Sequence, residues 1–219
     1  MLAVIIIVMA YLIGAIPFAL IVCAIFGVGD IRKQGSGNIG ATNAWRVAGF
    51  KVAVWVFIGD IGKGVVAVLL ARYVTSTYDT GPLSPDLFIV ACALAAIVGH
   101  VFPVYLRFKG GKGVNTSLGA VVTMLPVEAL ISFGVFLAVV LVFRYISLGS
   151  IVGAVAFLAS VVIEKFAMDV QMSSVYVYMA AVLAALIIVA HRQNISRLLA
   201  GTENRFSFSS KKSGERSDG

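Results

Sequence analysis

Glycines, short polar side chains and an arginine are concentrated in one segment of this 219-residue chain, GSGNIGATNAWR, which runs from Gly35 to Arg46. Glycine lets the backbone adopt positive φ, so successive N–H groups can turn toward one anion. Ser36, Thr42 and Asn43 add donors, and Thr42 or Asn43 is expected to cap a following helix, whose amino end also favours negative charge. Arg46 supplies a planar double donor suited to phosphate. The pattern favours an anion site, with a flexible basic connector as the alternative.

A second segment, RFKGGKGVNTS at residues 107–117, surrounds Lys112 with three glycines at the start of an expected helix. Here the backbone can pass closely while an ammonium group reaches an anion, although a plain basic connector has the same composition. Neither segment is a nucleotide motif. The first contains GxGxxG but follows an apolar run instead of a strand, and the second lacks the order GxxxxGK[ST].

The third segment, HRQNISRLLAGTE, covers residues 191–203. If it is helical, His191, Asn194 and Leu198 share one face, so His191 and Asn194 can meet one ligand. A histidine that is merely hydrogen-bonded remains the alternative.

The elements that must position these segments are membrane helices. The chain is 60% apolar and 12% charged, with a mean hydropathy of +1.02. Apolar runs approach or exceed the roughly 20 residues that cross a bilayer. They predict an all-α polytopic membrane protein with seven crossings, at residues 3–26, 52–71, 87–106, 114–125, 127–143, 147–163 and 172–190.

Lysine and arginine predict the orientation of these crossings. With the amino terminus outside, 14 of the 17 basic residues fall on the cytoplasmic side, as the positive-inside rule requires. The net charge of +7 then reflects topology and anion binding, and nucleic acid is not an expected partner. We expect one integral-membrane domain over residues 1–204 and a polar, disordered cytoplasmic tail over residues 205–219.

A few polar groups lie inside the predicted crossings. Asp60 and Lys63 are three residues apart on one helix face, where each alone would cost at least about 2.5 kcal/mol, so we expect them to pair or to meet partners on other helices. A structural brace is favoured over a proton path. His100, in the third crossing, is expected to be a hydrogen-bonded interior histidine. No cluster has metal-ligand spacing, so neither a metal nor another cofactor is expected.

The three segments, in this order between apolar runs, closely resemble the motifs of the membrane acyl-phosphate:glycerol-3-phosphate acyltransferases, the PlsY family. The sequence DIGKG in the second run also fits that family, and the resemblance covers about residues 10–203. It implies an enzyme that transfers a fatty acyl group from acyl phosphate to the 1-hydroxyl of glycerol 3-phosphate. The products are lysophosphatidic acid and inorganic phosphate, and no metal or cofactor takes part.

The resemblance also implies roles for individual residues. Ser36 and the first glycine-rich loop would hold the acyl-phosphate head group, while Arg46, Lys112, His191 and Asn194 would bind or orient glycerol 3-phosphate. These five side chains form the implied catalytic set. The other residues of the implied substrate-binding set are Gly35, Gly37, Asn38, Gly40, Thr42, Asn43, Gly110, Gly111 and Gly113.

Two questions stay open at this point. The sequence does not decide whether His191 or the substrate's own phosphate takes the hydroxyl proton, and we expect His191 chiefly to orient the substrate. An anion or organophosphate transporter is the competing function, although all three polar segments are predicted on one face, which favours interfacial chemistry. The expected surroundings are the bacterial cytoplasmic membrane, with the site facing the cytoplasm and an enzyme that makes acyl phosphate as a candidate partner.

Overall fold

The computed structural model describes residues 1–206 of the chain, so the predicted tail lies outside the described residues from position 207 onward. Within the described part, every regular element is a helix, which confirms the all-α prediction. The elements are α1 (Leu2–Ala15), α2 (Phe18–Ile25), η1 (Ile31–Lys33), α3 (Ala41–Ala48), α4 (Phe50–Thr77), α5 (Pro85–Val101), η2 (Val104–Leu106), α6 (Val114–Met124), α7 (Pro126–Phe143), α8 (Ile146–Phe166), α9 (Ser174–Ala190) and α10 (Arg192–Leu199).

The number of candidate membrane spans is four to six among the described residues. Four segments are long and apolar enough on their own: α4, α5 extended to Leu106, α7 and α8. Two bent pairs, α1 with α2 (42°) and α9 with α10 (60°), add a span each if each pair crosses once. The 11-residue α6 coincides with the predicted fourth crossing, but it rises only about 16 Å at about 1.5 Å per residue. Seven crossings and an external amino terminus therefore stay predictions.

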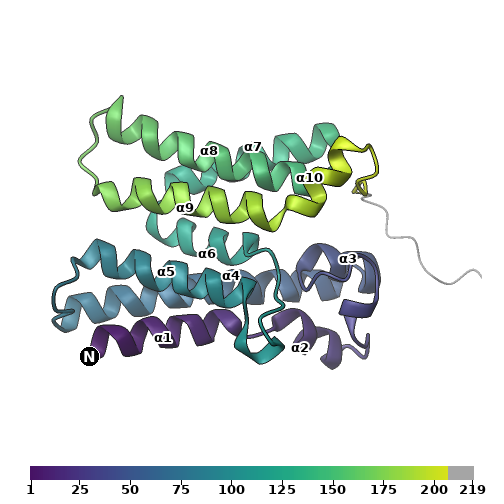
Figure 1. The fold of residues 1–219 in the computed structure, drawn as a ribbon, viewed down its shortest axis with the longest axis horizontal. Coiled ribbons are helices and arrows are strands. Elements are labelled where there is room, and N and C mark those ends of the chain that lie inside the picture. Colours follow the sequence, from purple (N-terminus) through teal and green to yellow (C-terminus); the bar gives the residue numbers. More distant parts are fainter. Residues whose placement is uncertain (207–219) are drawn as a thin grey trace, which may run out of the picture.

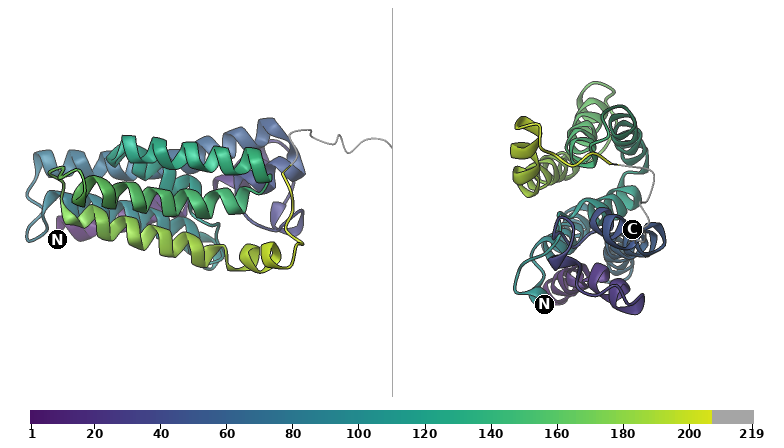
Figure 2. Two further views of the ribbon diagram at one scale, coloured as in Figure 1. Left: turned by 90° about the horizontal axis from the view of Figure 1, so that it is seen from above. Right: turned by 90° about the vertical axis from the view of Figure 1, so that its right-hand side faces the viewer.

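The helices form two groups that lie roughly side by side (Figure 1). One group contains α1, α4 and α5, and the other contains α7, α8 and α9, with α6 between them (Figures 1 and 2). α6 approaches α4 closely because both carry glycine at the contact. A side chain at Gly64 would overlap the carbonyl group of Thr116, and one at Gly119 would overlap that of Ile61. Small residues of this kind let membrane helices pack backbone against backbone.

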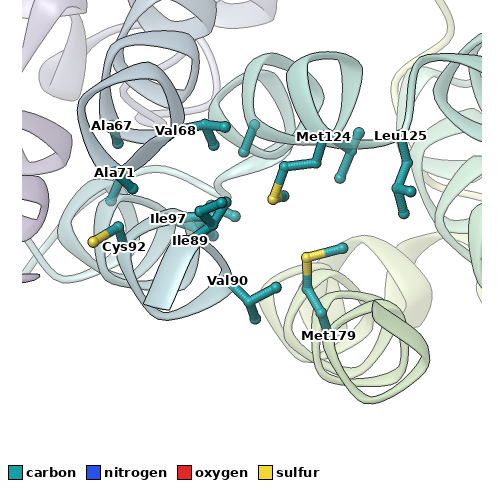
Figure 3. Packing of buried hydrophobic residues seen from close by; sticks show 14 of the residues in the cluster. Ala67, Val68, Ala71, Ile89, Val90, Cys92, Ile97, Met124, Leu125 and Met179 are labelled. Atoms are coloured by element: carbon teal, nitrogen blue, oxygen red, sulfur yellow. The ribbon is translucent and has the colours of Figure 1, made fainter. Parts of the chain in front are cut away.

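A buried apolar cluster joins the two groups (Figure 3). It contains Val68 of α4, Ile97 of α5, Met124 of α6 and Met179 of α9, each at most 7% exposed. In contrast, α7 keeps large apolar side chains such as Leu130 exposed, as expected for a helix that faces lipid. The core thus holds α6 and the second group in a fixed position relative to α4 and α5.

The chain's irregular segments gather at one end of the molecule, called here the site end. It carries α2, α3, the loop that precedes α6, and α10 (Figure 1). The opposite end carries residue 1 and the two turns at residues 78–84 and 167–173 (Figure 1). The three polar segments singled out from the sequence therefore lie at the same end of the helices.

Candidate functional site

A cavity of about 570 Å³ opens at the site end and is lined by all three polar segments. Of the fourteen site residues expected from the sequence, thirteen line it. They are Ser36, Gly37, Asn38, Gly40, Thr42, Asn43, Arg46, Gly110, Gly111, Lys112, Gly113, His191 and Asn194. Gly35 is the exception, and it acts on the shape of the loop, because its φ is +59° and a side chain there would overlap Oδ1 of Asn43.

The first loop is held in shape by the side chain of Asn43, which is only 1% exposed. Its Nδ2 donates to the carbonyl oxygens of Ile31 (3.0 Å) and Gln34 (3.1 Å), and its Oδ1 accepts from the backbone N–H of Ser36 (2.8 Å). Both amide hydrogens are thus used within the protein. Asn43 therefore shapes the wall of the cavity, while the Ser36 side chain remains at its surface.

The expectation that Thr42 or Asn43 caps the following helix is wrong. α3 begins at Ala41, and Gly40, which has no side chain, occupies the cap position. The glycine leaves room beside the first turn, where the N–H groups of Ala41 and Thr42 have no intrahelical acceptor. Both residues line the cavity, so these donors are placed where an anion would be stabilised.

The second loop brings Lys112 to the cavity. The N–H groups of Gly110 and Gly111 donate to the carbonyls of Val101 and His100, both at 3.1 Å, and fix the loop on the end of α5. The Lys112 ammonium then donates to Oδ1 of Asn194, 82 positions away in the sequence. Burial lowers the pKa of Lys112 to about 8; the Glu203 carboxylate opposes this effect, and the nearby cations Arg197 and Arg46 add to it.

The third segment contains the 60° bend between α9 and α10, and His191 lies at the bend. Its Nδ1 is 2.8 Å from the carbonyl oxygen of Ile187. Because that oxygen can only accept, Nδ1 carries the hydrogen and Nε2 keeps its lone pair. His191 lines the cavity at 2% exposure, so a ligand would meet it as a hydrogen-bonding group of fixed orientation.

Glu203 is a site residue to which the sequence analysis assigned no role. One carboxylate oxygen accepts from Ser147 (2.9 Å) and from Asn194 (2.6 Å), and the other accepts from Arg197 (2.7 Å). Burial alone raises the pKa of Glu203, but the hydrogen bonds from Asn194, Arg197 and Ser147 outweigh it and keep the pKa below its ordinary value. The signal in the sequence was a single acid in a segment otherwise rich in cations and amides.

Beyond Glu203 the chain crosses the site end and contacts the α7–α8 turn and α3. Arg205 donates from Nε to the hydroxyl of Tyr145 (3.2 Å), and the N–H of Phe206 donates to the carbonyl of Arg144 (2.6 Å). The Phe206 ring also lies 5.3 Å from that of Trp45 in α3. This segment therefore ties α10 to the α7–α8 turn and to α3.

Cationic groups outnumber the acceptors that the cavity offers them. Arg46 makes no hydrogen bond or ion pair with any residue in the described range 1–206, and Lys112 contacts only the neutral Asn194. Glu203 already accepts three hydrogen bonds, one of them from Arg197. An anionic ligand such as a phosphate would supply the missing acceptors.

A narrower apolar cavity of about 100 Å³ adjoins the polar one. The two share Phe57, Val114, Asn115, Phe136 and Ser150 in their walls. From there the apolar cavity extends between α6, α7, α8 and α9, where Val121, Phe157 and Leu183 are among its lining residues. A polar chamber that leads into an apolar groove suits a ligand with an anionic head and a hydrocarbon chain.

The predicted pair of Asp60 and Lys63 is present, with 3.0 Å between Oδ1 and Nζ. His100 joins it, since its Nδ1 lies 2.8 Å from the Lys63 ammonium. Asp60 and His100 contribute to the wall of the polar cavity, on the side where α4 and α5 approach the second loop.

Comparison with known proteins gives consistent matches over nearly the whole chain. The profile of a family described as glycerol-3-phosphate acyltransferase matches residues 4–201. Glycerol-3-phosphate acyltransferase of Syntrophotalea carbinolica is 46% identical over 197 residues, covering 90% of this chain and 94% of that protein. The enzyme of Geotalea daltonii is 41% identical over 205 residues, covering 93% and 97%.

Solved structures agree in fold as well. The crystal structure of PlsY, described as an integral membrane glycerol 3-phosphate acyltransferase, in its glycerol 3-phosphate form matches with a TM-score of 0.80 and 39% identity. The match covers 94% of this chain and 96% of that one. The lysophosphatidic acid form of the same protein matches with a TM-score of 0.79 and 38% identity.

Proposed function

The chain belongs to the glycerol-3-phosphate acyltransferase family, and from this premise we propose that its acyl donor is an acyl phosphate. The 1-hydroxyl oxygen of glycerol 3-phosphate attacks the acyl carbonyl carbon, and the bond between that carbon and the phosphate oxygen breaks. Lysophosphatidic acid and inorganic phosphate leave, and the hydroxyl proton ends on phosphate. Membership in this family gives the transporter hypothesis no support.

The observation that carries the proposal is the excess of donors and cations in the polar cavity, where both substrates of such a reaction would place phosphate. In this proposal Ser36 and the amides at the start of α3 hold the acyl-phosphate head. Arg46, Lys112 and Asn194 hold glycerol 3-phosphate, and the acyl chain lies in the adjoining apolar groove. Acyl phosphate already carries a good leaving group, so orientation, which contributes about 7 to 11 kcal/mol in favourable cases, can supply most of the rate.

His191 orients the glycerol hydroxyl in this scheme. With Nδ1 donating to Ile187, its Nε2 can accept a hydrogen bond from the substrate without having to carry the proton away. A His191→Ala enzyme should therefore bind glycerol 3-phosphate less tightly. Normal binding of both substrates together with a rate lost by several orders of magnitude would instead make His191 the base.

The donor is tested with purified protein in nanodiscs. Given palmitoyl phosphate and glycerol 3-phosphate, the protein should form lysophosphatidic acid and inorganic phosphate in equal amounts, measured by mass spectrometry and by phosphate assay. Acyl transfer from palmitoyl-CoA but not from palmitoyl phosphate would show that the proposed donor is wrong. The proposed setting is the bacterial cytoplasmic membrane with the cavity facing the cytoplasm, where an enzyme that makes acyl phosphate would be the supplying partner.

A further inference from the structure

A buried ionic cluster lies behind the second loop and takes no part in the proposed chemistry. Asp60 and Lys63 of α4 and His100 of α5 are 2%, 3% and 8% exposed. Oδ1 of Asp60 lies 3.0 Å from the Lys63 ammonium and 3.5 Å from Nδ1 of His100. Ionisable groups inside membrane helices are costly, so a cluster of three calls for a function.

Lys63 fixes the state of the histidine ring. Its ammonium meets three groups: Asp60 Oδ1, Nδ1 of His100 at 2.8 Å, and the carbonyl oxygen of Ile16 at 3.1 Å, at the break between α1 and α2. When Lys63 is charged, its ammonium carries three hydrogens and no lone pair, so Nδ1 of His100 accepts one of them. The hydrogen of the imidazole is then on Nε2, and the ring is held in one orientation.

The other edge of the same ring lies directly against the second loop. A side chain on Gly111 would overlap Nε2 of His100, and it would come within 2.8 Å of the carbonyl oxygen of Ile39 in the first loop. The backbone N–H of Gly111 donates to the His100 carbonyl at 3.1 Å. His100 is therefore in contact with Gly111 through both its ring and its backbone, and the next residue in the chain is Lys112.

We propose that Asp60, Lys63 and His100 form a positioning cluster for glycerol 3-phosphate. The cluster fixes the position of residues Gly110 and Gly111 through the His100 ring. These two glycines then hold the Lys112 ammonium opposite Asn194. The inference rests on the proposed function and deepens it, because it assigns a role in substrate affinity to charges that act through the position of Lys112. A purely structural brace would affect folding but would leave the affinity of the folded enzyme unchanged.

The test compares two substitutions of His100 with a matched control. His100→Leu removes the acceptor for Lys63, whereas His100→Gln keeps an acceptor for Lys63 and a donor toward Gly111. The control is Tyr11→Phe, which removes the 2.8 Å hydrogen bond from the Tyr11 hydroxyl to the carbonyl of Phe102, two positions after His100. Each enzyme is assayed in nanodiscs for kcat and for the KM of both substrates, and its Tm is recorded.

The expected result for His100→Leu is a rise of at least tenfold in the KM for glycerol 3-phosphate. Its kcat should stay within about threefold and its KM for palmitoyl phosphate should be unchanged, since a misplaced Lys112 weakens binding of the acceptor first. His100→Gln should recover most of the affinity, and Tyr11→Phe should match the wild type in KM. A lower Tm with unchanged KM in His100→Leu would overturn the proposal, as would equal losses in His100→Leu and Tyr11→Phe.

If His100→Leu does not fold, a second variant, Asp60→Asn, tests the positioning cluster. Oδ2 of Asp60 is buried without a hydrogen-bond partner in the described chain, so Asp60→Asn can keep the bond from Lys63 to Oδ1 while an uncharged NH2 group replaces Oδ2. It should raise the KM for glycerol 3-phosphate about threefold, and a wild-type KM would contradict the proposal. A wild-type enzyme that releases no phosphate from the two substrates would refute the proposed function instead.

Discussion

At the end of the molecule opposite the cavity, several polar side chains have partners close by. Tyr176 donates to Asp86 (2.8 Å), Lys165 donates to the carbonyl of Met172 (2.5 Å), and Asp79 accepts from the N–H of Gly81 (2.8 Å). These bonds close turns or join neighbouring helices. At the site end, by contrast, Arg46 has no hydrogen-bond partner among residues 1–206 and Lys112 meets only an amide.

The difference shows which polar groups complete the fold and which await a ligand. The three hydrogen bonds named at the opposite end are completed within the protein, so we expect them to contribute to stability. At the site end the three segments bring cations together around the Glu203 carboxylate, which already accepts three hydrogen bonds. Substitutions at the two ends should therefore differ in kind, with effects on activity at one end and small effects on stability at the other.

The largest contrast is expected between two arginines. Arg46→Ala removes a cation from the phosphate site and should lower kcat/KM by about 100- to 1000-fold, or about 2.7 to 4 kcal/mol, as for loss of one donor that stabilises transition-state charge. Arg72→Ala, at the opposite end of α4, should leave kcat/KM within about twofold. Phosphate release from palmitoyl phosphate measures both, and similar losses in the two variants would contradict the contrast.

The two hydrogen-bonded carboxylates should differ by a smaller factor. Glu203→Gln removes the charge that opposes repulsion among Arg46, Lys112 and Arg197 and places an amide donor where Arg197 now donates. We expect kcat/KM to fall about 10- to 100-fold, together with a lower Tm. Asp86→Asn keeps the oxygen that accepts from Tyr176 and should change neither quantity appreciably. Equal kcat/KM in the two variants would show that the Glu203 carboxylate does not contribute to the reaction.

The pH dependence of substrate affinity should reveal the cation in the second loop. Lys112 has a pKa of about 8 in the free enzyme, and bound phosphate favours the ammonium, so its pKa is higher in the complex. Below pH 8 the group is charged in both states. Above pH 8 binding requires uptake of a proton, so the KM for glycerol 3-phosphate should rise by up to about tenfold per pH unit.

The control for this profile is Lys112→Arg. Its guanidinium keeps its charge throughout the range, so the rise in KM above pH 8 should disappear even if the variant binds more weakly overall. If the KM of Lys112→Arg for glycerol 3-phosphate still rose above pH 8, a group other than Lys112 would be responsible for the pH dependence.

The smallest effect is expected in the apolar groove, where two neighbouring valines of α6 provide a matched pair. Val121 lines the groove and is 6% exposed, whereas Val122 is 38% exposed and lies outside its walls. Val121→Phe should narrow the groove and reduce kcat/KM for palmitoyl phosphate relative to octanoyl phosphate by several-fold. Val122→Phe should leave that ratio unchanged, and a shift in both variants would place the acyl chain elsewhere.

Much of this architecture follows from local properties of the sequence. Apolar runs predicted the helices, because solvation by lipid requires each one to satisfy its own backbone. Glycines and cations marked the three segments, and thirteen of the fourteen expected site residues line the cavity. Local sequence patterns were insufficient where hydrogen bonds to other parts of the chain determined the structure. The cap of α3 is Gly40 instead of Thr42 or Asn43, because Asn43 is engaged in holding the preceding loop.

The remaining features depend on contacts between residues far apart in the chain. Glu203 accepts hydrogen bonds from Asn194 and Arg197 in its own segment, but also from Ser147, 56 positions earlier, which no local pattern indicates. His100 looked like an ordinary interior histidine because neither its contact with Gly111 nor its bond to Lys63, 37 positions earlier, has a local signature. Such pairings are set by helix packing, which hydropathy does not encode.

The central claim is that three distant segments surround one pair of anionic head groups. Single cysteines at Asn38, Asn115 and Gln193 place one probe in each segment on the cavity wall, with Ser76 as a control at the opposite end. The native Cys23 and Cys92 are both 0% exposed, so their contribution to labelling should be small. In sealed vesicles of known orientation, a membrane-impermeant maleimide measures the side and the rate of labelling.

All three cavity positions should be labelled from the same side of the membrane and protected together by glycerol 3-phosphate, while the Ser76 position should be labelled from the other side and remain unprotected. Labelling of the three cavity positions from opposite sides, or protection of only one of them, would contradict the account.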